Sequence, residues 1–410
     1  MTAPLAGVRV LEVANMIAAP SAAAMMADLG ADVVKVEPLS GDILRGLVLG
    51  PEVEPDPWFE LDNRGKQGVA VDLDHPDGVA LVHRLAATAD VFITNLTAAR
   101  QERFQLTADV VLAAAPTIVH TTLTGYGAQG PEADRLAYDM TAFFARGGIQ
   151  SLVAEPGGPP AAFRPGQGDH TSSLSILAAV LAALRLRDQT GEGQRVEVAL
   201  FHVAAWTIAS DLTTTLVTGA DPERYHRDRW PSPLTCRFRC ADDRWVALSM
   251  PGPKDHFEAF ARCLGHPEWL DDPRFCDAEA RRDNAEVVIE ACDRAFATED
   301  RDSWAGRLDA AGLTWAPVQT AEEVVDDPQA EALGLLHLVS DHPAGPFHTV
   351  NAPFIIRDAD VGVRGRAPML GEHSRATLLE LGLTTADVER LVADGVVGAP
   401  TDPTRQEIDP

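Results

Sequence analysis

Residues 7–37 read GVRVLEVANMIAAPSAAAMMADLGADVVKVE, and their pattern indicates two strands joined by a helix. The segments VRVLEV and DVVKVE are apolar and rich in β-branched valine, as buried strands are. Between them, APSAAAMMADLGA carries strong helix formers and a glycine near its end. Because two strands joined by a crossover helix run parallel, the stretch predicts a parallel sheet.

The same alternation of strand and helix continues along the chain to residue 124. It includes the strand GVAVDL (68–73), the helix HPDGVALVHRLAATA (75–89) and the strands DVFITN (90–95) and PTIVHTTLT (116–124). We therefore expect an α/β fold with a doubly wound parallel sheet, whose ligands lie beyond the carboxyl ends of the strands. The loops expected there begin near Asn15, Glu37, Asp72, Asn95 and Gly125.

The chain has 410 residues, which is too long for one ordinary core. A segment rich in Pro, Arg and Asp, TGADPERYHRDRWPSPLTCRFRC (218–240), is typical of a linker that enters a second domain. We expect a large ligand-binding α/β domain over residues 1–220 and a smaller α/β domain over 221–320. A C-terminal segment, 321–410, is then expected to return to the large domain.

Charge and composition limit the partners of the protein. The formal net charge is −27, with 61 acidic against 34 basic residues, so the surface repels nucleic acid and anionic membranes. No apolar run reaches membrane-spanning length, and the first residues lack a secretory pattern. Five cysteines are too few for a disulfide framework and suit a reducing compartment. We expect a cytoplasmic protein with no nucleic-acid or membrane partner.

Three shorter motifs leave alternatives open. GYGAQG (125–130) has the spacing of a dinucleotide loop, but Pro131 and polar residues follow it, which favours a glycine turn close to some other ligand. Cys236 and Cys240 lack a second ligand pair, which favours buried thiols over a metal site, and we expect no metal. Arg64 and Lys66 in NRGKQG fit a solvated turn and an anion-binding turn equally well.

The stretch RPGQGDHTSS (164–173) precedes an apolar helix expected from Ser172 to Arg187. Local sequence favours Asp169 as the N-cap of that helix. A functional role uses the same physics, because a helix N-terminus lowers a carboxylate's pKa and orients it for attack on an acyl carbon. Gly166 and Gly168 would leave room for a thioester to approach. Both roles of Asp169 stay open on local grounds.

Taken together, the motifs resemble the class III CoA-transferases, typified by formyl-CoA:oxalate and carnitine CoA-transferases. The resemblance runs nearly end to end and includes PLAGVRVLEVANMIAAP, LGADVVKVEP, NRGKQGVAVDL, ADVFITN, TGYGAQGP, AYD, GQGDHTSS, DDPQ and RAPMLGEHS in this order. It implies an enzyme that transfers CoA from an acyl-CoA to a small carboxylic acid and holds no permanent cofactor. It also implies an interlocked homodimer, in which each chain is a ring threaded by the other.

By this resemblance, Asp169 matches the family's nucleophilic aspartate. It would form an aspartyl-acyl anhydride with the donor and then an aspartyl-CoA thioester, which passes CoA to the acceptor acid. The matching CoA-binding positions are Asn15, Met16, Ile17, Asp72, Leu73, Asp74, Asn95, Leu96, Arg103, Leu136, Tyr138 and Asp139. Two of the departures from the family pattern are Pro38 in place of an arginine and Leu136 in place of a basic residue.

The family also contains α-methylacyl-CoA racemases, which place a histidine where this chain has Tyr138. Tyrosine has an ordinary pKa of about 10 and is a poor base at neutral pH, so the sequence favours a transferase. Lyase or hydrolase chemistry on an acyl-CoA and a non-catalytic acyl-CoA binder are the remaining alternatives, although a binder leaves Asp169 unexplained. The glycine run that closes over the site in oxalate-type members is missing from residues 227–248, so we expect a different closing segment. Arg229 and Trp230 could substitute for it, although the sequence favours a packing role in the linker for both.

Overall fold

The computed structural model describes residues 1–47, 53–251 and 256–400, in two compact units. The first unit comprises Met1–Gln150, Ala162–Leu216 and Leu333–Pro410, and the second comprises Ser151–Ala161 and Val217–Ala332. Residues 401–410 of the expected C-terminal segment lie outside the described residues. The chain therefore leaves the first unit and comes back to it.

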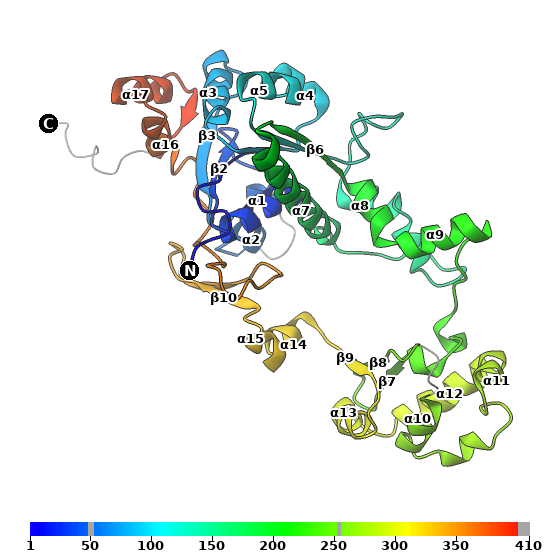
Figure 1. Cartoon of the computed structure of the whole chain (residues 1–410). Helices are drawn as coiled ribbons and strands as arrows, with labels where there is room; N and C mark the ends of the chain where they lie inside the picture. Colours follow the sequence, from blue (N-terminus) through cyan, green and yellow to red (C-terminus); the bar gives the residue numbers. More distant parts are fainter. Residues whose placement is uncertain (48–52, 252–255, 401–410) are drawn as a thin grey trace. The chain divides into compact units, whose positions relative to one another are not determined.

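A mixed sheet forms the centre of the first unit, as Figure 1 shows. In the described residues its strands follow the order β12-β3-β2-β1-β4-β5-β6, and all neighbours run parallel except the antiparallel edge pair β12 and β3. The strands are β1 (Arg9–Val13), β2 (Asp32–Glu37), β3 (Gln67–Val71), β4 (Val91–Thr94), β5 (Val119–Thr124), β6 (Gln194–Ala199) and β12 (Val397–Gly398). The predicted α/β fold with a parallel-dominated sheet is confirmed.

Helices cover both faces of this sheet. One buried cluster packs α1 and α7 against β1, β4 and β5, and another packs α3, α5, α16 and α17 on the other face. The helices of the first unit are α1 (Ala18–Asp28), α2 (Pro57–Asn63), α3 (Pro76–Ala86), α4 (Ala98–Arg103), α5 (Ala108–Ala114), α7 (Gln167–Thr190), α8 (Leu200–Thr207), α16 (Ser374–Glu380) and α17 (Thr385–Ala393). Shorter elements are η1 (Ile43–Gly46), the π-helix η2 (Asp139–Ala145) and the hairpin β10 (Leu336–Val339) and β11 (Phe347–Val350). None of the helices in the described ranges is both long and apolar enough to cross a membrane.

The predicted strand–helix–strand start is confirmed in detail. Val10 of β1 lies in register with Val33 of β2 and Val91 of β4, so the apolar strands occupy the centre of the sheet. Helix α1 buries ten of its eleven residues, mostly alanines, which lets it pack closely. It ends just before Gly30, whose φ is +92° and whose missing side chain makes room for Ala3. A Cβ at Gly30 would lie 2.3 Å from the Ala3 Cβ, so only glycine fits.

The second unit is an α/β unit with its own core. Its strands β7 (Arg237–Arg239), β8 (Trp245–Leu248) and β9 (Trp315–Val318) form an antiparallel sheet. Its helices are α10 (Phe257–Cys263), α11 (Ala278–Asp283), α12 (Ala285–Phe296), α13 (Arg301–Ala310), α14 (Ala321–Val325) and α15 (Pro328–Ala332), with 3-10 turns η3 (Arg227–Arg229), η4 (Pro233–Thr235) and η5 (Pro267–Leu270). Helices α6 (Ile149–Leu152) and α9 (Ala209–Thr218) stand where the chain passes between the units.

Candidate active site

Asp169 lies in the first turn of α7 and is not the cap of that helix. The helix begins at Gln167, earlier than the Ser172 expected from sequence, and Gly166 is the N-cap with a φ of +88°. The cap is supplied from elsewhere in the chain. The Oδ2 atom of Asp139 accepts hydrogen bonds from the N–H groups of Gly166 at 2.8 Å and Gly168 at 3.2 Å. The local interpretation of Asp169 as an N-cap was therefore wrong, because a buried carboxylate 27 or more residues away takes those donors.

The glycines around Asp169 make room for protein and not for a ligand. A Cβ at Gly168 would lie 2.8 Å from the ring of Phe143 and 2.9 Å from the Cβ of Asp139. A Cβ at Gly166 would lie 2.8 Å from the ring of Trp58. The expectation that these glycines leave space for a thioester is thus replaced by a structural role. They let the start of α7 sit against the side chains that hold it.

The electrostatic surroundings of Asp169 also differ from the expectation. Burial, together with the nearby carboxylates of Asp139 and Asp62, raises the pKa of Asp169 to about 7. The charge of His170 acts in the opposite direction. The predicted lowering of this pKa by the helix N-terminus was wrong, since the first N–H groups of α7 already bond to Asp139. Asp169 therefore titrates in the neutral range, which is typical of functional carboxylates.

Sequence reasoning missed the pair formed by His170 and Asp62. The Nε2 atom of His170 lies 3.0 Å from the Oδ1 atom of Asp62, at the end of α2. Burial opposes a charge on His170, but the hydrogen bond and the charge of Asp62 outweigh it and raise the His170 pKa. The Asp62 side chain is fully buried, and its second oxygen has no hydrogen-bond partner. No local signal reveals this pair, because its members are 108 residues apart.

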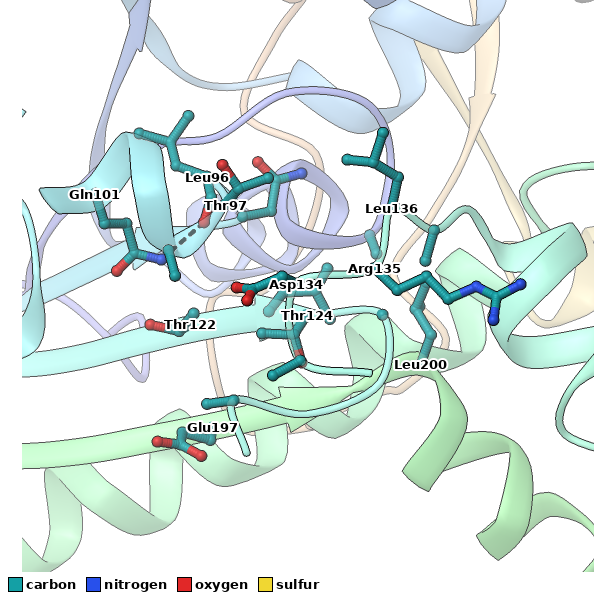
Figure 2. Close-up of a pocket in the computed structure, with 18 of the residues that line it drawn as sticks. Leu96, Thr97, Gln101, Thr122, Thr124, Asp134, Arg135, Leu136, Glu197 and Leu200 are labelled. Carbon is teal, nitrogen blue, oxygen red and sulfur yellow. Dashed lines mark hydrogen bonds between the residues drawn. The ribbon is translucent and has the colours of Figure 1, made fainter. Parts of the chain in front are cut away.

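A cavity of about 560 Å³ opens beside Asp169, among the loops at the carboxyl ends of the strands. Figure 2 shows its walls, which come from the loop after β4, from β5 and β6, and from the loop before η2. Of the positions matched by the family resemblance, the cavity is lined by Met16, Ile17, Asn95, Leu96, Leu136, Tyr138 and Asp169. Gly125 also lines it, as expected for a glycine turn close to a ligand.

Asn95 ties two of these loops together. Its Oδ1 accepts from the N–H of Asn15 at 3.0 Å, and its Nδ2 donates to the Asn15 carbonyl at 2.7 Å. The next residue, Met16, has a φ of +69°, and its N–H donates to the Asp42 carboxylate at 3.0 Å. The loop after β1 is thereby fixed at the mouth of the cavity. This is a positioning role for Asn15 and Asn95 that does not depend on a bound ligand.

The remaining matched positions lie around two neighbouring cavities. One, of about 340 Å³, is lined by Asn15, Asp72, Leu73, Asp74, Leu96 and Arg100 among others. The other, of about 380 Å³, includes Leu73, Asp74 and Arg103. Arg103 forms an exposed ion pair with Asp74 at 2.7 Å. Asp139 lines none of these cavities and is almost fully buried, so in this chain it positions α7.

Arg64 and Lys66 are not available to an anion. Arg64 pairs with Asp28 at 2.7 Å, and the Nζ of Lys66 lies 2.6 Å from Glu12. Both side chains are buried, so the anion-binding interpretation of NRGKQG was wrong, and so was the solvated turn. Each cation instead neutralises a buried carboxylate inside the first unit.

The other sequence candidates lie in the second unit. Cys236 and Cys240 are buried in its core, as expected for structural thiols. Trp230 packs near Tyr225 and donates its indole N–H to Thr235 at 3.1 Å. Arg229 forms an exposed ion pair with Glu286 at 3.2 Å. Within the described ranges, no group of three or more His, Cys, Asp or Glu side chains is arranged to hold a metal ion.

Comparisons with known proteins agree with this geometry. The model of CoA-transferase family III matches residues 5–374. The (R)-2-hydroxy-4-methylpentanoate CoA-transferase of Clostridioides difficile is 33% identical over 92% of this chain and 95% of its own. The cinnamoyl-CoA:phenyllactate CoA-transferase of Clostridium sporogenes is 29% identical over 95% and 96%. A crystal structure of a CaiB/BaiF family protein from Brucella suis superposes with a TM-score of 0.83 at 30% identity, covering 93% of this chain and 100% of that one. The chain is therefore an enzyme of CoA-transferase family III, the class III CoA-transferases.

Proposed function

We propose that this enzyme moves CoA from a donor acyl-CoA to an acceptor carboxylic acid through covalent intermediates on Asp169. The position of Asp169 carries the proposal. Its carboxylate lines the 560 Å³ cavity, and burial beside Asp139 and Asp62 raises its pKa to about 7. A carboxylate with a raised pKa is more basic than an ordinary one and still largely ionised above neutral pH, which suits a nucleophile.

The proposed sequence balances without a net proton. An oxygen of Asp169 attacks the thioester carbonyl, the C–S bond breaks, and CoA leaves as a thiolate from a mixed anhydride. The thiolate then attacks the carbonyl of Asp169, the donor acid leaves as a carboxylate, and Asp169 carries CoA as a thioester. The acceptor carboxylate attacks this thioester to form a second anhydride, and CoA leaves as a thiolate. The thiolate attacks the carbonyl carbon that came from the acceptor acid, which releases the new acyl-CoA and restores the Asp169 carboxylate.

The first-unit side chains support a division of labour in CoA binding. The cavity beside Asp169 has mostly apolar walls and suits the end of the pantetheine arm together with the acyl group, since both must meet at the carboxylate. Leu96 also lines the adjoining cavity, where Arg100 and Asn15 stand near the expected nucleotide end. We assign phosphate contact to Arg100 and Arg103, because guanidinium groups are planar donors that match phosphate. The local arginines must act against the strongly negative overall charge.

We also infer that two copies of the chain form an interlocked homodimer. Helices α7, α8 and α9 present large apolar side chains to solvent, including Leu174, Leu181, Trp206 and Leu216. Trp206 is 79% and Leu216 84% exposed, which is unusual unless another surface covers them. Light scattering coupled to gel filtration should give twice the chain mass, and the double variant Trp206→Asp with Leu216→Asp should lower it. A monomeric parent protein would contradict the inference.

Replacing Asp169 tests the chemistry directly. Asp169→Ala should lower the rate of CoA exchange by at least about 10⁴-fold, as the loss of a covalent nucleophile does in other enzymes. The matched control is Asp188→Asn, an exposed aspartate near the other end of α7, which should keep its activity. Borohydride or hydroxylamine added with acyl-CoA should modify Asp169, as seen by peptide mass spectrometry. Retained exchange in the Asp169→Ala protein would end the proposal.

The same assay separates transfer from racemisation. A racemase must exchange the α-proton of its acyl-CoA with solvent, whereas the proposed transfer leaves that carbon untouched. In D2O without an acceptor acid, we expect no deuterium at the α-carbon. Tyr138, which is exposed and lines the cavity, stands where a racemase has its histidine. Rapid deuterium uptake would identify the racemase in place of the transferase.

A further inference from the structure

We infer that the acids served by this enzyme are monocarboxylic acids with an apolar chain, and that dicarboxylic acids of the same length are poor substrates. The inference rests on the proposed function, because it concerns the acyl group that Asp169 would carry. Its basis is the charge and the polarity of the cavity beside Asp169. Both can be read from the side chains that line this cavity and from what already binds them.

Carboxylates dominate the charged groups of the cavity. The acidic side chains that line it are Glu102, Asp134, Asp169 and Glu197. In the described part of the chain, Arg135 is the cation among its lining residues. A second carboxylate on a substrate would enter a negative field and lose part of its hydration, and each of these effects weakens its binding.

Arg135 is poorly placed to receive that second carboxylate. Its guanidinium donates to Glu132 at 2.9 Å, and Arg146 lies 3.6 Å from the other oxygen of Glu132. In Figure 2 the Arg135 side chain extends away from Thr122, Gln101 and Glu197. The charge of Arg135 is thus already shared with a neighbouring carboxylate outside the cavity lining.

Three further cations near the start of α7 are buried or partly buried and already paired. His170 bonds to Asp62, Arg64 pairs with Asp28, and Lys66 pairs with Glu12. Breaking one of these buried pairs to bind a substrate would leave an unpaired buried carboxylate, which is costly. No cation of this group is therefore open to a dicarboxylic acid.

The walls near Asp169 favour an apolar chain instead. Met16, Ile17, Ala18 and Leu200 line the cavity together with Asp169. Ile17 also packs with Trp58 in a small buried cluster, beneath Gly166 at the start of α7. Each methylene that moves from water into such surroundings improves binding by about fourfold, the equivalent of ~0.8 kcal/mol. A longer apolar acid should therefore be served better until the cavity is full.

Self-exchange tests this inference without knowledge of the natural donor. The purified full-length enzyme is mixed with an acyl-CoA and its own ¹³C-labelled acid, and label entering the acyl-CoA is followed by mass spectrometry. The matched pairs are butyrate with succinate and hexanoate with adipate, each with the corresponding mono-CoA thioester. We expect kcat/KM to rise from butyrate to hexanoate and to be at least tenfold higher for hexanoate than for adipate. Equal or faster exchange of adipate would overturn the inference while leaving the covalent mechanism standing.

A charge variant sharpens the test. Glu197→Gln removes one negative charge from the cavity lining and should raise the adipate-to-hexanoate ratio of kcat/KM about threefold, the effect of ~0.7 kcal/mol. Glu192→Gln, on the exposed turn before β6 and outside the cavity lining, should leave the ratio unchanged. An unchanged ratio in Glu197→Gln would contradict the charge argument. If none of the four acids exchanges label with its own CoA thioester, the proposed function fails, and the inference fails with it.

Discussion

Two clusters of buried carboxylates in the first unit have opposite surroundings. At the carboxyl ends of β1 and β2, Lys35 lies 2.8 Å from both Glu12 and Asp42, and Lys66 lies 2.6 Å from Glu12. The second cluster lies at the start of α7 and consists of the carboxylates of Asp62, Asp139 and Asp169. Among the groups that shift the Asp169 pKa, His170 is the cation. We call the first the lysine cluster and the second the aspartate cluster.

The difference separates carboxylates that are held in ion pairs from one that titrates near neutral pH. In the lysine cluster, burial disfavours a charged Lys35, but Glu12 and Asp42 outweigh it and raise the Lys35 pKa. Burial lowers the pKa of Lys66 to about 8 despite the charge of Glu12, so Lys66 is still mostly charged at pH 7. In the aspartate cluster, no lysine or arginine of the described residues bonds to Asp169, and burial together with the neighbouring carboxylates raises its pKa to about 7. A buried carboxylate with a full set of cations is inert, whereas one held among other carboxylates is available for chemistry.

The largest predicted loss of stability follows from removing a lysine from the lysine cluster. Its carboxylates then have less positive charge beside them, as in the aspartate cluster. Lys66→Met removes the cation that lies 2.6 Å from Glu12. It also removes the hydrogen-bond donor that the backbone carbonyls of Pro20 and Asp62 accept from at 2.8 Å. Glu12 keeps Lys35 at 2.8 Å, but removing one partner from a buried ion-pair network costs about 3–5 kcal/mol of unfolding free energy. Urea unfolding at pH 7 measures it. Arg390→Met, which breaks exposed pairs with Asp77 and Asp394, should change little, and a similar small loss for Lys66→Met would contradict the comparison.

A smaller loss should follow when the aspartate cluster is forced apart. An alanine at position 168 would press on Phe143 and on Asp139, so the carboxylate that bonds Gly166 and Gly168 must move. We expect about 1–3 kcal/mol less stability, typical of overpacking, together with lower exchange activity. Gly306→Ala is the control, because Gly306 lies on α13 with open space around it. If both variants fold equally well, the tight fit at Gly168 has no energetic weight.

The ionised form of Asp169, which the proposed mechanism requires, should lower the stability of the fold. The fold raises the pKa of Asp169 from its ordinary value of 3.8 to about 7, so folding favours the protonated acid. Stability is therefore lost as pH rises through this window, and the loss is complete above about pH 7. Asp169→Asn carries no charge and should melt at least about 2 °C above the parent protein at pH 8, with a smaller gain at pH 5. Scanning calorimetry at both pH values measures it.

A reversed trend would contradict the raised pKa. If Asp169→Asn were stabilised more at pH 5 than at pH 8, the parent carboxylate would have to be favoured as an anion by the fold. Asp188→Asn serves again as the control, and its melting temperature should differ little from that of the parent at either pH. This separates the buried carboxylate from a general effect of lowering the negative charge.

Local patterns predicted the scaffold of the site better than its chemistry. The strands around Val10, Val33 and Val91 follow from β-branched apolar runs, and the loops after them are placed by topology alone. Local sequence also identified Asp169 as a candidate, because it stands among glycines just before an apolar run. Its raised pKa could not be found, because that depends first on burial and then on the carboxylates of Asp139 and Asp62, the second of which is more than 100 residues away in sequence.

The same limit explains the errors at Arg64 and Lys66 and the unforeseen helix-capping role of Asp139. A charged residue in a turn reads as exposed unless its partner is known, and Arg64 and Lys66 are paired with Asp28 and Glu12 of earlier elements. Asp139 looked like a ligand contact, but it caps a helix that begins 28 residues later at Gln167. In each case a long-range hydrogen bond or ion pair decides the role, and a single sequence contains no local record of it.

The smallest predicted effect concerns His170, the cation of the aspartate cluster. His170→Gln keeps an N–H donor for Asp62 but carries no charge. It therefore removes the charge of His170, which lowers the Asp169 pKa against the effects of burial, Asp139 and Asp62. The acid limb of kcat/KM for acyl-CoA, expected near pH 7 in the parent enzyme, should therefore move up by roughly one unit, the effect of ~1.4 kcal/mol. A purely structural role would lower the rate without moving this midpoint. His202→Gln, on the exposed face of α8, should leave the profile in place. A downward shift in His170→Gln would mean that the aspartate cluster does not hold its nucleophile by charge, and the contrast with the lysine cluster would fail.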